Sequence, residues 1–367
     1  MKITHIEAHP VVVPDVLPPF RWRDGLPGSA EYGGAADGVI LRIGTDTGAE
    51  GAAYLSRLGA FPLVAALVEK VYKPEYLGKD PLLREWQYHR MWELDRLHEF
   101  PLPVFGLMDV ALWDLAGRVA GLPTWKLLGG MRETIPAYAS TSTFDTTAQF
   151  LDVATQCIEA GYPAIKLHAW GDAKRDAALC LALRAHLGDD IDLMYDGSAG
   201  FDLPDAIYLG HALSEANFRW YEEPMREFSV SAYRELARSV QVPLLSAETS
   251  DGAHMNSADF IMAGAATFGL RTSAGLRGGI TGAMRIAHLA DSFRIRAEVH
   301  GGGIISEHLC MAISNTTYYE SLITSSSVTR ESIVGADGLV RAPTEPGIAL
   351  PPGIDYPTAV RHLARAA

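Results

Sequence analysis

Residues 194–250 have the sequence MYDGSAGFDLPDAIYLGHALSEANFRWYEEPMREFSVSAYRELARSVQVPLLSAETS, and this stretch decides the fold. It contains three acidic residues, Asp196, Glu222 and Glu248, at equal intervals of 26 residues (196 to 222 and 222 to 248). Each follows a short apolar run and precedes small residues or proline. One strand–loop–helix–loop unit of a parallel α/β protein has about this length, so a strand-end position recurs once per unit. We therefore expect the three carboxylates to converge at the ends of consecutive parallel strands.

Several carboxylates without basic partners repel one another unless a cation lies between them. A small set of hard oxygen ligands is typical of Mg²⁺ with open positions for substrate oxygens. The alternative is that each acid is an exposed loop residue, but the equal spacing on matching strand ends argues against it. The stretch thus predicts a Mg²⁺ site formed by Asp196, Glu222 and Glu248.

Strand and helix patterns alternate on both sides of this stretch, which predicts a parallel sheet with both faces covered by helices. Seven or eight such strand–helix units fit a closed barrel better than an open sheet. An eighth strand element is expected through 315–320. We expect seven strands separated by six helices, at 134–140, 164–170, 192–198, 218–224, 243–249, 266–272 and 295–301.

The first part of the chain has a different pattern. Residues 2–14 and 37–55 predict strands, the second range forming a hairpin with its turn at 45–48. Residues 61–120 have apolar positions three and four apart, which indicates helices. Strands followed by a run of helices predict an α+β domain. The tail, 335–367, is rich in glycine and proline, and we expect it to pack back onto this domain.

Between the first strands lies a loop, 14–34, that contains Arg21, Trp22, Arg23 and Tyr32. A loop of about 20 residues inside a compact domain is commonly functional or disordered, and these side chains are unlike those of a disordered linker. We expect it to cover substrate; the alternative is a plain surface loop or an oligomer contact.

The composition of this 367-residue chain limits the kinds of partner that it can bind. Its net charge of −13 argues against nucleic acid or an anionic membrane as a main partner. The three cysteines are far apart and lack the spacing of a metal site or a disulfide framework. The N-terminal sequence has no signal-peptide pattern, so we expect a cytoplasmic protein.

Other ionisable residues lie at the remaining strand ends. Lys166 and His168 are two positions apart on one strand, so both side chains should point into the barrel mouth. Either residue can serve as the base, and the lysine can instead neutralise a substrate carboxylate. His300 lies at the end of a strand across the barrel and is a candidate acid. The alternative is that His300 only caps a loop. Glu320, if protonated, can donate a hydrogen bond to substrate; the alternative is an exposed charge.

These residues resemble the enolase superfamily, and more narrowly its mandelate racemase subgroup. The resemblance rests on ALWDLAGRVAGLPTWKLLGG, IKLHAW, LMYDGSAGF, WYEEP, SAET, GGIT and EVHGGG, in this order along the chain. It implies an α/β fold, a modified (β/α)7β TIM-type barrel (126–334) with an α+β N-terminal capping domain (1–125, completed by about 335–367). It also implies that Mg²⁺ is held by the three acids, that an enolate forms from a carboxylate substrate, and that the loop 21–32 closes over it.

The chain departs from the subgroup at two positions. The second barrel strand of the subgroup commonly ends in Lys-x-Lys, and His168 stands at the second lysine. The sixth strand usually supplies an aspartate to the seventh-strand histidine, but alignment on GGIT puts Ser273 there. His300 then lacks the partner that would raise its basicity, so it is a poorer base but a sufficient acid. Arg271 is expected to compensate by binding a substrate carboxylate or hydroxyl, or else merely fills the barrel.

These departures favour an acid-sugar dehydratase over a racemase or epimerase on the same site. A binding relative without catalysis is a third hypothesis. The expected partner is a small-molecule carboxylate, a sugar acid, and we expect the chain to form a homo-oligomer.

Overall fold

In the computed structural model, which describes residues 1–13, 20–26, 36–56 and 60–350, the chain begins with an antiparallel sheet. Its strands are β1 (Ile3–Val13), β2 (Ala36–Thr45) and β3 (Glu50–Ser56), in the order β1-β2-β3. The hairpin between β2 and β3 is closed by the Thr45 amide, which donates to the Ala49 carbonyl at 3.0 Å. Gly48 has φ +80°, which glycine adopts without steric cost. The predicted hairpin and its turn are therefore present.

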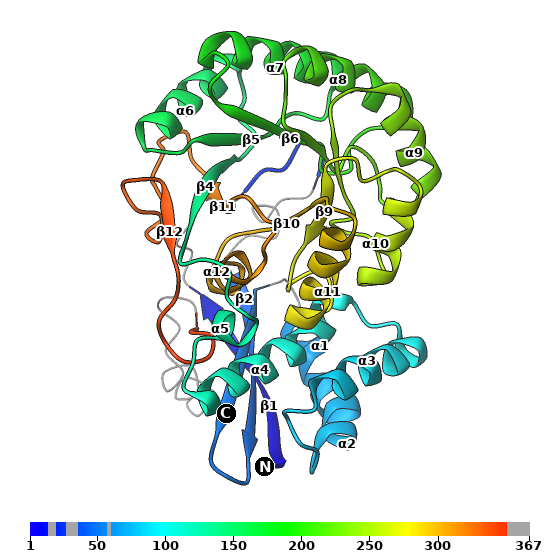
Figure 1. Ribbon diagram of the computed structural model, residues 1–367, viewed down its shortest axis with the longest axis vertical. Coiled ribbons are helices and arrows are strands. Elements are labelled where there is room, and N and C mark those ends of the chain that lie inside the picture. Colours follow the sequence, from blue (N-terminus) through cyan, green and yellow to red (C-terminus); the bar gives the residue numbers. More distant parts are fainter. Residues whose placement is uncertain (14–19, 27–35, 57–59, 351–367) are drawn as a thin grey trace.

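Helices follow this sheet and complete the capping region, the lower part of Figure 1. The most buried of them, α4, packs against β3 and against α11 of the barrel. It ends at Gly121, whose φ of +65° stops the helix just before Pro123. The helices are α1 (Ala60–Leu67), the π-helix η1 (Val68–Tyr72), α2 (Lys73–Tyr76), α3 (Arg84–His98), α4 (Leu102–Ala120) and α5 (Thr124–Leu127).

The second region is a barrel whose strands are parallel neighbours in chain order, with the last strand, β11, beside the first, β4. Its strands are β4 (Thr134–Thr141), β5 (Ala164–His168), β6 (Asp192–Asp196), β7 (Trp220–Glu222), β8 (Leu244–Ser246), β9 (Gly269–Thr272), β10 (Arg296–Val299) and β11 (Tyr319–Ile323). Each of the seven strands predicted by the repeat is present within its predicted range, apart from one residue at the end of β4.

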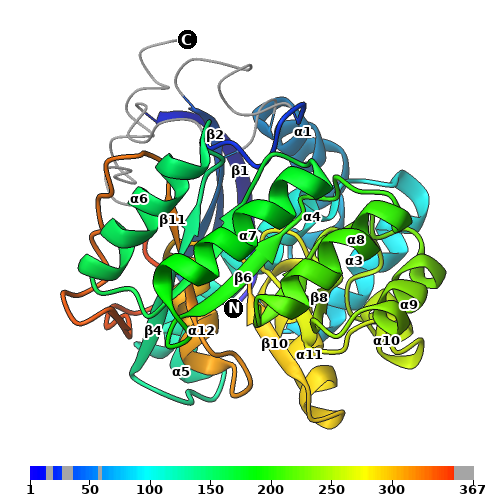
Figure 2. The same cartoon turned by 90° about the horizontal axis from the view of Figure 1, so that it is seen from above.

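Helices cover the outer face of these strands; α6 to α10 form the outer arc of Figure 1, and α6 to α8 cross in front of the barrel in Figure 2. They are α6 (Thr147–Glu159), α7 (Ala173–Leu187), α8 (Leu203–Glu215), α9 (Val230–Ser239), α10 (Ala253–Met262), α11 (Gly279–Ser292) and α12 (Ile304–Ala312).

The barrel closes through isolated hydrogen bonds between β10 and the segment that leads into β11. The Ala297 amide donates to the Asn315 carbonyl at 3.2 Å, and the Val299 amide donates to Thr316 Oγ1 at 3.4 Å. Two details here differ from the sequence prediction. The eighth strand begins only at Tyr319, and the short helix α12 was missed because its nine residues are too few for a clear periodic pattern.

Inside the barrel, side chains lie in layers. One apolar layer contains Ala164, Met194, Trp220 and Leu245 beside Tyr138. Two residues further along their strands come Lys166, Asp196 and Glu222. Because side chains of a strand alternate between its two faces, this apolar layer lies directly beneath the ionisable groups.

The C-terminal tail follows a different course from the one expected. Its strand β12 (Leu339–Arg341) pairs antiparallel with β4, so this part packs on the barrel. Only further on does the tail reach the capping region, where the Ile348 amide donates to Asp114 Oδ1 of α4 at 2.6 Å. Residues 351–367 lie outside the described part of the chain. In the described residues, no helix has the length and apolar character needed to span a membrane.

Candidate active site

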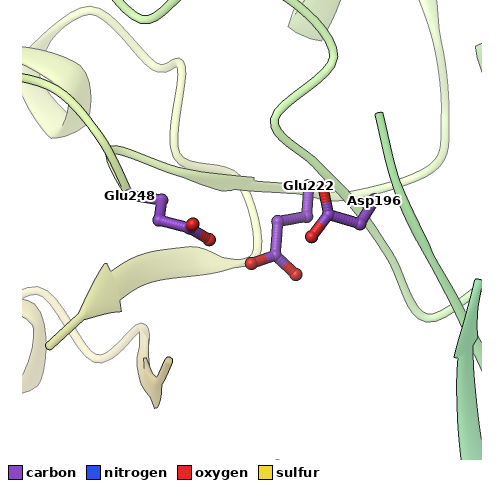
Figure 3. A group of neighbouring side chains, drawn as sticks. All are labelled: Asp196, Glu222 and Glu248. Atoms are coloured by element: carbon purple, nitrogen blue, oxygen red, sulfur yellow. The ribbon is translucent and has the colours of Figure 1, made fainter. Parts of the chain in front are cut away.

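The three predicted acids lie together at the carboxyl ends of the barrel strands (Figure 3). Strand register pairs Asp196 with Glu222, and His168 with Asp196, so these residues share one level. Glu248 lies two residues beyond β8, and Glu222 lies between the other two acids. One carboxylate oxygen of each lies within 4.8 Å of the others, and all three side chains are buried. The predicted acid triad, Asp196, Glu222 and Glu248, is therefore present.

The backbone beside each acid is strained. Ser198 (φ +45°) lies two residues after Asp196, Glu223 (φ +38°) directly follows Glu222, and Ala247 (φ +72°) directly precedes Glu248. Residues with a side chain seldom adopt the left-handed region, and such strain persists only where the surrounding structure enforces it. The concentration of these residues beside the acid triad marks the place where chemistry is expected.

One enforcing group is Glu227, which the sequence analysis missed. Its carboxylate accepts the amides of Ala247 and of Thr249, the latter at 2.6 Å, and so holds both neighbours of Glu248. Arg277 holds the next part of the same loop by donating to the carbonyls of Ser250 and Ala253. The main chain that carries Glu248 is therefore fixed by both groups. The sequence signal that could have revealed Glu227 is the last acidic residue of the run WYEEPMRE (220–227).

Lys166 lies beneath the acid triad and is 1% exposed. Its Nζ lies 3.0 Å from Asp196 Oδ2, 3.1 Å from Glu222 Oε2 and 2.9 Å from Glu320 Oε1. Burial acts to lower the pKa of Lys166, but Glu222 and Glu320 outweigh it and hold that pKa well above the usual value. A lysine ammonium has three donors, and here each faces a carboxylate.

Arg271 has a role different from the substrate contact expected of it. It is fully buried, and Nε donates to Glu222. Its Nη2 donates to Tyr138 Oη and to Glu320 Oε2, each at 2.8 Å, and Nη1 donates to the Val299 carbonyl. Every nitrogen of the guanidinium is thus engaged, so Arg271 supports the acids instead of meeting substrate.

Glu320 also differs from expectation. It forms an ion pair with Lys166 and accepts hydrogen bonds from Arg271 and from the Gly301 amide, the last at 2.7 Å. Although burial opposes it, the charges of Lys166 and Arg271 hold the pKa of this carboxyl well below its usual range. An ionised carboxylate only accepts hydrogen bonds, so Glu320 in this arrangement is not the donor that we had expected.

The charges of this cluster do not balance. Four carboxylates, those of the acid triad and Glu320, contact two permanent cations, Lys166 and Arg271, which leaves two negative charges. Burial, and then the charges of Glu223, Glu222 and Asp196, hold the pKa of Glu248 well above its usual range. Among the described residues, the buried Glu248 Oε2 accepts no hydrogen bond. Three oxygen ligands, an unused acceptor and a deficit of two charges fit a divalent cation such as Mg²⁺.

The two histidines contact the two outer acids of the triad. His168 Nδ1 lies 2.9 Å from the Thr141 carbonyl, and Nε2 lies 3.1 Å from Asp196 Oδ2. A carbonyl can only accept, so Nδ1 carries a proton and the lone pair of the neutral ring is on Nε2. His300 Nε2 lies 3.1 Å from Glu248 Oε1, and its side chain is 31% exposed. The two imidazoles thus lie at opposite ends of the acid triad.

Ser273 stands where the subgroup usually has an aspartate, but its hydroxyl bonds within its own loop. Its Oγ accepts the Gly275 amide at 3.1 Å. Burial lowers the pKa of His300 to about 4. Within the described residues, the only ionisable partner that contacts the His300 ring is therefore Glu248.

Part of the expected covering loop lies over these groups. Phe20 meets the His168 ring edge-on, with ring centroids 5.0 Å apart. Arg21 forms ion pairs with Asp145 and Asp24, and Trp22 is 37% exposed. Arg23 Nε donates to the Ser198 carbonyl at 3.1 Å, beside the acid triad. Tyr32, also expected to contact substrate, lies outside the described residues.

Comparison with known proteins agrees with this geometry. The family model of enolase C-terminal-like domains matches residues 149–353, and that of the mandelate racemase/muconate lactonizing enzyme N-terminal domain matches residues 29–129. The chain belongs to the mandelate racemase branch of the enolase superfamily. The expected family and the fold class, a TIM-type barrel with a capping domain, are thereby confirmed.

Relatives within the superfamily differ in reaction. The 3,6-anhydro-alpha-L-galactonate cycloisomerase of Streptomyces coelicolor is 29% identical over 84% of this chain and 87% of its own length. The structure of D-glucarate dehydratase from Agrobacterium tumefaciens, complexed with magnesium, has a TM-score of 0.83, 29% identity and 98% coverage of both chains. A racemase from Streptomyces coelicolor with bound magnesium has a TM-score of 0.81, 25% identity and 99% coverage of both chains. The protein is therefore an enzyme of this superfamily, with lyases and isomerases among its relatives.

Proposed function

We propose that this protein is a Mg²⁺-dependent acid-sugar dehydratase, which removes water from a sugar acid to give a 2-keto-3-deoxy acid. The proposal rests on one observation, the two imidazoles at opposite ends of a buried acid triad. The similarity to a magnesium-containing D-glucarate dehydratase, over nearly the full length of both chains, supports it.

Asp196, Glu222 and Glu248 would hold the Mg²⁺ ion. When bound, the ion would supply positive charge against the negative charge that the substrate gains on losing its alpha proton. Arg271 and Lys166 keep Glu222 in place between them, and Glu227 fixes the loop that carries Glu248. The protein thus contributes a rigid set of ligands to the ion.

His168 is the better candidate for the base that removes the alpha proton. Because Nδ1 donates to the Thr141 carbonyl, Nε2 is the ring nitrogen that can accept a proton, whereas all three donors of Lys166 face carboxylates. Once His168 has accepted a proton, the imidazolium lies 3.1 Å from Asp196 Oδ2, and this carboxylate stabilises the new charge.

His300 is the candidate acid. Because burial leaves its ring neutral near pH 7, the proposal requires that His300 takes up its proton beside Glu248 when substrate is bound. In beta-elimination the C–O bond to the departing hydroxyl breaks, and a proton from His300 converts that hydroxyl into water. The proton of the alpha carbon stays on His168, and the enol that forms tautomerises to the 2-keto-3-deoxy acid. Solvent then restores both histidines. The absence of a carboxylate at Ser273 supports this role, because an acid needs less basicity than a racemase base does.

A screen of aldonic and aldaric acids with Mg²⁺, followed by an assay for 2-keto acids, tests the proposal. We expect at least one acid to yield a 2-keto-3-deoxy product with the wild type and none to do so with Glu222→Gln. If no acid yields such a product, the protein is not a dehydratase of this class. If Glu222→Gln retains full activity, the acid triad is not the site.

An isomerase acting on the same kind of acid is the second candidate, supported by the cycloisomerase and racemase relatives. Turnover in D₂O separates the two reactions. An isomerase incorporates deuterium at the alpha carbon without forming a 2-keto acid, whereas a dehydratase releases water and incorporates deuterium at carbon 3 of the product.

A further inference from the structure

The segment 20–26 is fastened to the barrel mouth by its main chain. The Thr143 amide donates to the Arg21 carbonyl at 2.8 Å, and the Asp24 amide donates to the Trp170 carbonyl at 3.1 Å. The Arg21 amide also donates to Ser142 Oγ at 2.8 Å. These bonds fix Arg23 at a definite place above the ends of β5 and β6.

Two arginines of this segment differ in how their charge is used. The guanidinium of Arg21 is paired with Asp145 and Asp24. Arg23 forms no ion pair with any described residue; its Nε donates to the Ser198 carbonyl and its Nη1 donates to the Asp24 carbonyl at 3.2 Å. A guanidinium has five N–H donors, and three of those of Arg23 bond to no described residue, so they can serve a ligand.

The surroundings of Arg23 are shaped to admit its side chain. A Cβ atom at Gly200 would lie 2.7 Å from Arg23 Cδ, so any side chain there would displace the arginine. Ser198 links this arginine to the acid triad, since its amide donates to Asp196 Oδ1 at 2.9 Å while its carbonyl accepts Arg23 Nε. Ser198 alone therefore links the Arg23 guanidinium to Asp196 and sets the separation between them.

A second unpaired arginine, Arg226, lies on the adjoining loop after β7. This loop is bonded to the loop after β6 through the Phe201 amide and the Pro224 carbonyl, 3.1 Å apart. Arg226 is exposed and, like Arg23, forms no ion pair with a described residue. Burial lowers the pKa of Arg23, and so does the positive charge of Arg226. Two cations on adjoining loops, neither in an ion pair with a described residue, can attract an anion to a chain whose net charge is −13.

We propose that Arg23, assisted by Arg226, binds a second anionic group of the substrate, at the end remote from the carboxylate that meets the acid triad. The substrate is then a dianion, either an aldaric acid or an acid sugar that ends in a phosphate. This inference rests on the proposed function for the position of the first carboxylate. Arg21 and Arg271 are not alternatives because their guanidinium groups are already paired with carboxylates.

The test compares three sets of substrates of equal carbon number, aldaric acids, aldonic acids and aldonic acids phosphorylated at the far end, with the Mg²⁺-loaded enzyme. We expect wild type to have its highest kcat/KM on a dianionic set. Arg23→Met keeps most of the side-chain stem but removes the charge, and it should lower kcat/KM on that set by about tenfold to a hundredfold, chiefly through KM. Its kcat/KM on aldonic acids should fall by a clearly smaller factor, because that loss reflects only the missing bond to the Ser198 carbonyl. Arg23→Lys should recover part of the loss on the dianionic set.

The matched control is Arg21→Met, which removes a cation of the same segment whose charge is already paired. It should change kcat/KM on dianionic and monoanionic acids by the same factor. Equal losses on both classes in Arg23→Met, or an aldonic acid as the best substrate of wild type, would overturn the proposed subsite while leaving the dehydratase in place.

If no acid is turned over, measurements of substrate binding still test the Arg23 subsite separately from the dehydratase proposal. Titration calorimetry with Mg²⁺ and an aldaric acid, or the matching aldonic acid, measures the subsite without chemistry. Tighter binding of the diacid to wild type, lost in Arg23→Met, supports the subsite even if the dehydratase proposal fails. Equal affinity for both acids refutes it.

Discussion

His168 and His300 are held by different kinds of partner. The Thr141 carbonyl fixes the tautomer of His168, whereas the His300 ring has only Glu248 as an ionisable partner among the described residues. A fixed tautomer favours a base, since its lone pair always points to the same place. The proposed division of labour between the two rings therefore follows from their hydrogen bonds.

Substituting each histidine separately tests this division. His300→Asn should lower the rate of 2-keto acid formation by about a hundredfold to ten thousandfold yet still exchange the alpha proton with D₂O. His168→Asn should lose both product formation and exchange. Mass spectrometry of recovered substrate measures the exchange. If His300→Asn loses exchange and His168→Asn retains it, the two roles are reversed.

At the scale of elements, α4 and α11 join the capping region to the barrel. The buried Asp109 of α4 accepts the Thr281 amide at 2.9 Å and the Thr281 hydroxyl at 2.6 Å, both in the first turn of α11. A carboxylate at a helix N-terminus satisfies amides that have no partner within the helix. Trp113 Nε1 also donates to Thr281 Oγ1, at 2.9 Å, which strengthens the same contact.

This contact should make stability depend on pH. Burial raises the pKa of Asp109 to about 6, against about 3.9 in an unfolded chain. The folded state therefore binds the proton more tightly, and this contribution to stability is full below about pH 4 and is lost as the pH rises through about 6. We expect the free energy of unfolding of wild type, relative to Asp109→Asn, to fall by about 1–3 kcal/mol over that range.

Urea denaturation of both proteins at several pH values, without Mg²⁺, measures this difference. The asparagine keeps one acceptor oxygen for Thr281 but cannot titrate. A difference between wild type and variant that stays constant from about pH 4 to about pH 7 would show that Asp109 is not the titrating group.

At the scale of the whole molecule, the acid triad joins three strand ends that follow one another in the barrel. A cation bound there stabilises only the folded state, because the unfolded chain does not bring the three carboxylates together. At a Mg²⁺ concentration of about 100 Kd, the free energy of unfolding should rise by about 2.7 kcal/mol.

Glu248→Gln should abolish most of this Mg²⁺ effect. Without metal, the variant should be at least as stable as wild type, since a buried charge that repels Glu222 and Glu223 is gone. Thermal unfolding with and without Mg²⁺ measures both effects. Glu235→Gln, which changes an exposed carboxylate of α9, is the control and should respond to Mg²⁺ like wild type. An equal Mg²⁺ shift in Glu248→Gln would place the metal elsewhere.

Much of the fold and part of the site follow from the sequence alone. The spacing of 26 residues between acids, with apolar runs before them, determined the parallel strands, the closed barrel and the meeting of Asp196, Glu222 and Glu248. This succeeds because the length of a strand–helix unit and the two-residue period of a strand are local properties. The expected homo-oligomer stays a prediction.

Only the tertiary structure decided which charges are paired. The sequence does not reveal that Arg271 is enclosed by Glu222 and Glu320. Nor does it reveal that Arg21 pairs with Asp145 while Arg23 forms no ion pair with a described residue. These contacts join strands and loops that are far apart in the chain, and they depend on strand register and on how the barrel closes. The charge of a residue is local, but the partner that neutralises it is set by the whole fold, and so is its availability for substrate.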